Sequence, residues 1–354
     1  MAAVQVNLDS LPDDSFSQVI SAAGDIAGDY VPFFEAVKGL GCVSKGMLQQ
    51  LHRVRPTVSV NSLVVVQRHF HGPWRVVLLH QGKLTKAVLK QARQGRVRAV
   101  TIMGCDVGGQ FHLGPRIARL VVPELLGAGC SLIEFTVSGV KLNSTWASIF
   151  GEAAVCSTVL RRLHLVNCKL RGPLPELRLP ALQKLNLSSN FLSGGLEPLQ
   201  SCTALRGLHL HSNKLSGGLE ALRNCTALQN VNLERNHKLT GGLEPLRGCV
   251  ALQTLELYCN KLSGGLEPLR GCTKLQKLTL YFNHFTGSLE ALRSCSALQA
   301  LDLCHNKFTG DLAPLRDCTA LQLLYLQHNQ LSPTEEDKAH FEKQCPTFSR
   351  TYSI

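Results

Sequence analysis

Residues 182–204 read LQKLNLSSNFLSGGLEPLQSCTA, and close variants of this segment follow one another to residue 331. The repeats open at Leu182, Leu205, Leu228, Leu252, Leu275, Leu298 and Leu321. Their period is 23 residues, with one additional residue beside His237. The alternating leucines of each LxxLxLxx segment predict a short strand with one buried face. One unit cannot bury its leucines alone, so the repeats are expected to stack into a horseshoe-shaped solenoid with a parallel β-sheet on its concave side.

Asparagine and cysteine recur at two further positions of the repeat. The asparagines are Asn190, Asn213, Asn236, Asn260, Asn283, Asn306 and Asn329. At the corner after each strand, an inward asparagine amide meets backbone groups that have no sheet partner, so this column is predicted to be structural. The cysteines are Cys202, Cys225, Cys249, Cys272, Cys295 and Cys318. Their regular spacing, without any paired CxxC motifs, predicts a buried packing column rather than a zinc site.

Looser repeats precede the regular ones, with openings at Val97, Leu132 and Leu160. Their wider spacing leaves room for helices on the convex side, which we expect at residues 115–129 and 144–157. The predicted organisation is an N-terminal helical cap over 1–57, irregular repeats over 58–181, regular repeats over 182–331 and a C-terminal cap over 332–354. Thr334 and the acids after it predict that the last cap is a helix. The predicted fold class is α/β.

The net charge of +12 is unevenly distributed along the chain. Residues 1–35 carry six acids and no Lys or Arg, residues 36–105 carry twelve Lys and Arg and no acid, and the remainder contributes +6. Within the basic stretch Lys38–Arg98, several cations follow helical spacing. A solvated face or a contact with an acidic protein is the favoured interpretation, with binding of nucleic acid or an acidic membrane surface as the alternative.

The chain has no motif that indicates catalysis or a cofactor. It lacks the GxxxxGK[ST] and GxGxxG phosphate motifs and the GxSxG nucleophile motif, so we expect neither an enzyme nor a bound cofactor. The first residues lack a basic start and a long apolar run, and the longest apolar runs are too short to span a bilayer. An intracellular protein of the cytoplasm or nucleus is therefore expected, with a lost signal sequence as the alternative.

The candidate site follows from the strand positions that point away from the leucine core. In the late repeats these outward positions become aromatic and charged, and stacking brings them into columns on the concave face. The predicted partner-binding residues are Glu256, Tyr258, Lys277, Tyr281, Phe282, His305, Tyr325 and His328. Exposed aromatic residues flanked by charge are typical of protein interfaces. The alternatives are that the rings only pack on one another, and that His305 and His328 bind a metal rather than forming a solvated pair.

The repeats resemble those of leucine-rich-repeat proteins. The LSGGLEPL segments are similar to the LxGxIPxxL outer segment of plant-type repeats, and LRGPLPEL at 170–177 is closer still. The irregular early repeats and the EKQCPTF segment near the C-terminus are more similar to the intracellular, cysteine-containing class. The resemblance implies a protein-interaction module whose client binds the concave face.

A segment near the N-terminus resembles an F-box, the helical module that docks on the cullin-linker protein of SCF-type ubiquitin ligases. The resemblance lies in SLPDDSFSQVI and LGCVSKGMLQQLHRVRP. The matching positions are Leu11, Pro12, Phe16, Val19, Ile20, Val43, Met47, Leu48 and Leu51. The resemblance implies an adaptor that links a ubiquitin ligase to a substrate held by the repeats. The alternative is a scaffold whose N-terminal helices only cap the solenoid.

Overall fold

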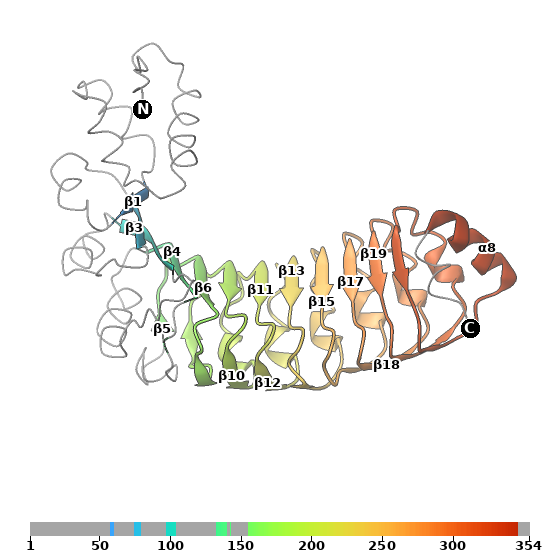
Figure 1. Ribbon diagram of the computed structural model, residues 1–354, viewed down its shortest axis with the longest axis horizontal. Helices are drawn as coiled ribbons and strands as arrows, with labels where there is room; N and C mark the ends of the chain where they lie inside the picture. The colour runs from blue at the N-terminus through green and yellow to red at the C-terminus, as the bar shows by residue number, and fades with distance from the viewer. Residues whose placement is uncertain are drawn as a thin grey trace, which may run out of the picture.

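The computed structural model describes residues 132–139, 142 and 155–345, together with the backbone of three earlier strands at 57–59, 74–78 and 97–103. In this part of the chain, twelve parallel strands form one continuous sheet in the order of the sequence. The strands are β1 (Thr57–Ser59), β2 (Trp74–Leu78), β3 (Val97–Met103), β4 (Glu134–Ser138), β6 (Arg162–Val166), β9 (Lys184–Asn186), β11 (Gly207–His209), β13 (Asn230–Asn232), β15 (Thr254–Glu256), β17 (Lys277–Thr279), β19 (Ala300–Asp302) and β21 (Leu323–Tyr325). Figure 1 shows the coils one after another along the long axis.

The interior is a column of leucines. In each coil the strand leucine and the two that flank it are buried, as are the leucines of the outer segment. Equivalent residues pair directly between strands, so that Leu208 lies beside both Leu185 and Val231. The period-2 alternation therefore places the repeat leucines inside and the intervening side chains, including the exposed Leu323, on the opposite face of the sheet. The predicted repeat and its parallel sheet are confirmed.

After the corner, most of the coils form a second short strand and then a single turn of 3₁₀ helix. The short strands form two sheets, β7 (Arg171–Pro173), β10 (Phe191–Gly194), β12 (Lys214–Gly217) and β14 (Lys238–Leu239) in one, and β16 (Ser263–Gly264), β18 (His284–Gly287), β20 (Lys307–Gly310) and β22 (Gln330–Leu331) in the other. The 3₁₀ turns are η3 (Glu197–Leu199), η4 (Glu220–Leu222), η5 (Glu244–Leu246), η6 (Glu267–Leu269), η7 (Glu290–Leu292) and η8 (Ala313–Leu315). The 3₁₀ turns agree with the short outer segment, whereas the sequence did not indicate the second strands.

The asparagine column ties neighbouring coils together. The Asn236 side chain is fully buried, and its Nδ2 donates to the carbonyl oxygens of Leu210 and Leu233, each at 3.0 Å. Its Oδ1 accepts the backbone N–H of Leu215 at 3.1 Å. One amide thus pairs backbone groups of its own coil and of the coil before it. Since a buried peptide group without a partner is costly, the column fixes how the coils stack.

The additional residue at His237 changes this pattern at one place. In the next coil, Asn283 Oδ1 accepts the N–H of Leu262, the residue two positions after the preceding corner asparagine. Asn260 instead accepts the N–H of the preceding corner asparagine itself, Asn236, at 3.1 Å. One sheet of short strands also ends here at β14, and the other begins at β16. The insertion is therefore absorbed in the outer segment, and the twelve-stranded sheet continues past it without a register shift.

The cysteine column is buried as predicted. All six side chains of the column are inaccessible to solvent, and Cys225, Cys249, Cys272 and Cys295 each direct Sγ at the carbonyl oxygen of the preceding cysteine at 3.5–3.6 Å. Burial raises the pKa of Cys225 to about 11 and that of Cys249 to about 12. These thiols remain protonated and act as small apolar side chains with a weak donor.

Helix α8 (Glu335–Gln344) closes the last coil, as the sequence predicts. Thr334 and Asp337 form a reciprocal capping box. Asp337 is fully buried, and it also accepts the N–H of Leu312 and a hydrogen bond from Arg316 Nε at 2.9 Å. Burial alone would raise the pKa of Asp337, but these hydrogen bonds together hold it below its ordinary value. The helix is thereby anchored to the penultimate coil.

Several predictions concern other parts of the chain. The N-terminal helical cap, the F-box-like residues and the predicted helix at 115–129 lie outside the described residues. The predicted helix at 144–157 is wrong at its end, because residues 155 and 156 form strand β5 (Val155–Cys156), which pairs with β8 (Leu177–Arg178). The sheet also begins earlier than expected, since β1 and β2 precede the first repeat recognised in the sequence.

We expect Asn236→Ala to destabilise the solenoid by about 1–3 kcal/mol, because the buried N–H of Leu215 and two carbonyl oxygens lose their partner. Urea unfolding followed by circular dichroism measures the change. The matched control is Asn224→Ala, at an exposed asparagine of the preceding coil, which should change the stability little. Equal effects of the two substitutions would contradict a structural role for the column.

Candidate partner-binding site

The predicted site residues occupy four outward columns of the large sheet, on the face predicted to be concave. Lys277 lies in the first column, where it pairs across the sheet with Thr254. Glu256 and Tyr325 belong to the second column, in which Tyr325 pairs with Asp302. The third column contains Tyr258 and Tyr281, and the fourth contains Phe282, His305 and His328. Stacking therefore brings the predicted residues to one end of one face.

Five of them form a continuous stack of rings, which we call the aromatic ladder: Tyr258, Tyr281, Phe282, His305 and His328. The rings of Tyr258 and Tyr281 are stacked with centroids 4.3 Å apart, and Tyr281 meets Phe282 edge to face at 5.7 Å. Phe282 stacks on His305 at 4.1 Å, and His305 stacks on His328 at 4.1 Å. The rings do pack on one another, as the alternative interpretation holds, so their edges rather than their faces remain available to a partner. Tyr325 is on the same sheet but outside the ladder.

The fourth column has an uncommon backbone conformation. Its residues have φ between 52° and 58° in every described regular coil, a left-handed conformation that bulky side chains rarely adopt. Asn167, His305 and His328 occupy this position in other coils, and asparagine and histidine adopt the conformation more readily than most residues. One late coil places Phe282 there, with 50% of the residue exposed. Fold stability alone therefore does not account for a phenylalanine at this position.

Charged residues adjoin the ladder. Lys277 forms an ion pair with Glu256, and Glu256 also accepts a hydrogen bond from Asn232 Nδ2 at 2.8 Å. Asn232 Nδ2 lies 3.3 Å from a carboxylate oxygen of Glu234, and the Arg235 guanidinium lies 5.9 Å from the ring centroid of Tyr258. Glu234, Asn232 and Arg235 were not among the predicted site residues. Their place one coil before Tyr258 in the same columns is the signal that identifies them.

Partial burial is the main cause of the pKa shifts in the site. Burial, the Glu234 carboxylate and Tyr281 raise the pKa of Tyr258, and burial raises that of Tyr281. Burial also raises the pKa of Asp302 and, with the neighbouring His328, lowers that of His305. The two tyrosines of the ladder are therefore neutral, and Arg235, Lys277 and the carboxylates near them supply the charges beside it.

The described residues were also compared with the requirements for binding a metal and for crossing a membrane. His305 and His328 stack ring on ring, with 20° between their planes, and in the described ranges no three His, Cys, Asp or Glu side chains form a group that could hold a metal. Within the same ranges, no helix has the length and apolar character needed to cross a bilayer. The arrangement is suited to contact with another molecule through ring edges, hydroxyls and a few charges.

Comparison with known proteins agrees with this architecture. A family described as Leucine Rich Repeat matches residues 181–202. No curated protein sequence matches the chain. The fold is a leucine-rich-repeat solenoid.

Three solved structures resemble this leucine-rich-repeat chain. A TDR receptor is 22% identical over 76% of this chain and 53% of its own, with a TM-score of 0.57. The plant peptide hormone receptor RGFR1 in complex with RGF2 is 22% identical over 74% of this chain and 48% of its own, with a TM-score of 0.54. A plant ice-binding protein is 21% identical over 67% of this chain and 74% of its own, with a TM-score of 0.51. The chain thus spans about half the length of the two receptor chains.

We expect the stability of the leucine-rich-repeat array to fall on mild acidification in a way that depends on His305. Because its pKa is lower in the folded than in the unfolded chain, the neutral ring contributes stability above the ordinary histidine pKa of about 6.5. That contribution is lost as the pH falls through the folded value. Thermal unfolding between pH 7.5 and 5 should therefore show a steeper loss for wild type than for His305→Phe, which keeps a stacking ring without titration. Parallel curves for the two proteins would contradict the expectation.

Proposed function

We propose that this protein is a non-enzymatic protein-interaction scaffold that binds a protein client on the sheet face around the aromatic ladder. The contacting residues would be those of the ladder together with Glu256, Lys277 and Tyr325. Such a surface combines ring edges and tyrosine hydroxyls with ions of both signs, a composition typical of interface centres.

The observation that carries the proposal is Phe282. It is one of the largest exposed apolar side chains of the described residues, and it occupies a left-handed position where smaller residues serve equally well in other coils. Strained and exposed large side chains persist where a function requires them. Stacking on His305 holds the Phe282 ring in place, so a partner meets a pre-ordered surface and little side-chain entropy is lost on binding.

The fold offers supporting analogy. In the RGFR1 structure a receptor of this architecture holds the ligand RGF2. We infer that the present chain likewise holds a ligand, here a protein client on the large sheet.

We expect Phe282→Asn to abolish capture of the client while leaving the fold intact, because asparagine tolerates the left-handed conformation. Full-length wild type and variant, each immobilised, are compared by quantitative mass spectrometry of the captured proteins. A client is a protein retained at least tenfold better by wild type than by Phe282→Asn.

The matched control is Val250→Ser, which removes an apolar side chain of similar exposure, 54% against 50% for Phe282, in the segment between η5 and β15. It should capture the client as wild type does. If the two variants lose the same proteins, or if neither loses any, the ladder is not the binding surface.

We further propose that the scaffold is the substrate-binding subunit of a ubiquitin ligase. Support comes from the F-box-like segment, whose Leu11 and Pro12 stand at the family's opening Leu-Pro. Such an adaptor acts inside the cell, in agreement with the expected location in the cytoplasm or nucleus. The competing hypothesis is a plain scaffold or signalling regulator whose N-terminal helices only cap the array.

Co-purification with the cullin-linker protein distinguishes the two hypotheses. Wild type should retain the linker, and the double substitution Leu11→Ala/Pro12→Ala should lose it at least tenfold while its thermal unfolding stays unchanged. Retention by the double variant, or no retention by wild type, removes the ligase adaptor and leaves the scaffold.

A further inference from the structure

The second strands of five consecutive coils carry a row of basic side chains, four lysines and one histidine, that is separate from the ladder. We call it the basic row: Lys214, Lys238, Lys261, His284 and Lys307. Each follows the corner asparagine and is exposed, and each is followed by a buried Leu or Phe and then by a serine or threonine on the same face. Figure 1 shows β10, β12 and β18 in line along one edge of the solenoid. Totals of charge along the sequence do not reveal the row, because it gains only one cation per coil.

Hydroxyl groups alternate with the basic row across the strands. The pairing register sets Ser216 beside Lys238, Ser263 beside His284, and Thr286 beside Lys307. Paired residues of a parallel sheet share a face, so Lys238, His284 and Lys307 each adjoin a hydroxyl of the preceding coil. Strands β14 and β16 are not paired, so the row has a break between Lys238 and Lys261. Neighbouring strands lie about 4.8 Å apart, which sets the spacing of the row. The result is a narrow array of ammonium and hydroxyl groups on two successive sheets of short strands, in which Thr240 Oγ1 and Thr286 Oγ1 also donate to the carbonyl oxygens of Gly217 and Gly264.

The lysines of the basic row have no ion-pair partner within the described part of the chain. Neither of the two outward positions is acidic in any of these coils, and none of the four lysines forms an ion pair with a carboxylate of the described residues. On the opposite side, by contrast, Arg247, Arg270 and Arg293 pair with glutamates of their own coils. Phe191 occupies the equivalent position in the coil before Lys214. The Arg171 guanidinium and the Lys214 ammonium lie 5.5 Å and 5.6 Å from the centroid of its ring.

We propose that the basic row binds a linear anionic polysaccharide along the axis of the solenoid. A single file of basic side chains, one to a coil, matches a ligand that repeats its charge along a line, unlike the surface of a folded protein. Single-stranded nucleic acid is bound chiefly by aromatic platforms for its bases, and the row offers only Phe191 and His284. The serine and threonine hydroxyls hydrogen-bond the oxygen-rich sugar units, while the ammonium groups meet carboxylates or sulfates.

The binding is multivalent, which decides how it is measured. An exposed ion pair contributes little by itself, so affinity depends on several coils acting together and on the length of the polymer. It also falls steeply with salt, because the polymer releases its condensed counterions. Both properties distinguish the basic row from a pocket for a small anion.

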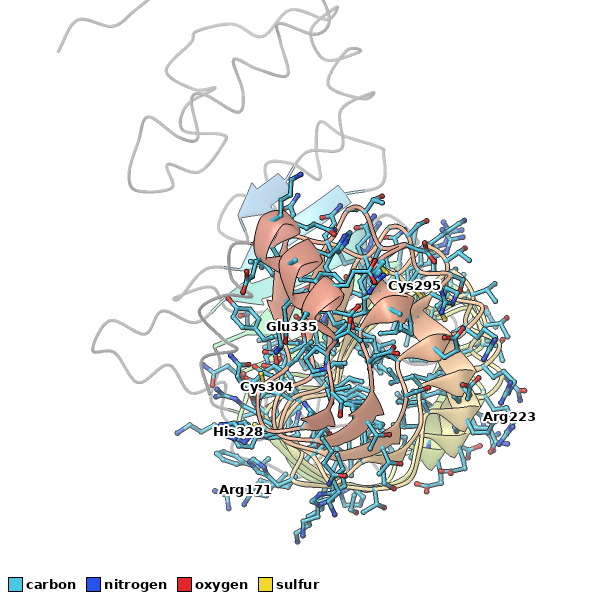
Figure 2. The ribbon with its side chains drawn as sticks, turned by 90° about the vertical axis from the view of Figure 1, so that its right-hand side faces the viewer. Arg171, Arg223, Cys295, Cys304, His328 and Glu335 are labelled. Atoms are coloured by element: carbon cyan, nitrogen blue, oxygen red, sulfur yellow. The ribbon has the colours of Figure 1, made fainter. Side chains whose placement is uncertain are left out.

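The test uses the full chain with polygalacturonate and dextran sulfate as probes, and neutral dextran as the uncharged control. The row variant is Lys214→Gln/Lys238→Gln/Lys261→Gln/Lys307→Gln. The matched variant removes four exposed cations elsewhere, Arg206→Gln/Arg223→Gln/Lys274→Gln/Lys343→Gln, so the two have the same net charge. Figure 2 shows Arg223 on the side away from His328 and Arg171.

We expect wild type and the matched variant to bind at least one anionic probe with similar affinity, the row variant to bind at least tenfold more weakly, and none to bind dextran. A preference between the two probes identifies the anion as carboxylate or sulfate. In lysine footprinting with an acetylating reagent, the polymer should protect the lysines of the basic row several-fold and leave Lys274 reactive. Equal losses in the two variants, no binding by wild type, or tighter binding of a single-stranded oligonucleotide than of either polysaccharide would overturn the proposal.

Discussion

The hydrogen bonds of the corner asparagines are the constraint on which the rest of the structure depends. Each amide pairs with backbone groups of two successive coils, as Asn213 does when it donates to the carbonyl oxygens of Leu187 and Leu210. These peptide groups are buried at a bend where no sheet partner reaches them, so a slipped coil would leave them unpaired. Leucine burial is non-directional, whereas the amide requires hydrogen bonds of defined distance and angle. The hydrophobic effect thus drives stacking and the asparagine sets its register.

Because the register is fixed, residues at the same position of successive repeats lie side by side in columns across the sheet. Tyr258 and Tyr281 are far apart in the chain, but their rings stack at 4.3 Å because their strands pair in register. The same register sets Thr286 beside Lys307 on the second strands. Both proposed surfaces are consequences of this geometry, one on the large sheet and one on the short strands. They lie on different strands of each coil, so a client and a polyanion need not compete.

The two surfaces differ in how far packing restrains them. The aromatic ladder is held by ring stacking, and its left-handed backbone positions follow directly from the corner that the asparagine closes. The basic row is exposed and lies beside hydroxyls rather than carboxylates. A ladder held by ring stacking is suited to a shaped protein contact, whereas an exposed row of basic side chains is suited to a ligand recognised by its repeating charge.

Much of the architecture was determined by the sequence alone. The period of 23 residues, the Leu, Asn and Cys columns and the capping helix after Thr334 were all legible, because each depends on local periodicity or on a single capping residue. The set of outward aromatic residues could be predicted from the sequence for the same reason. The helix predicted to end at residue 157 was wrong at its end, since Val155 and Cys156 find a strand partner in residues 177–178 that local propensity cannot reveal.

Only the tertiary structure decided which side chains meet. It separated Tyr325 from the ladder, added Asn232, Glu234 and Arg235 to its surroundings, and showed that the ladder rings cover one another's faces. It also revealed the second strands, and with them the basic row. The physical reason is that strand pairing between coils joins residues more than twenty positions apart, and the direction of an outward side chain depends on that pairing rather than on its neighbours in the chain.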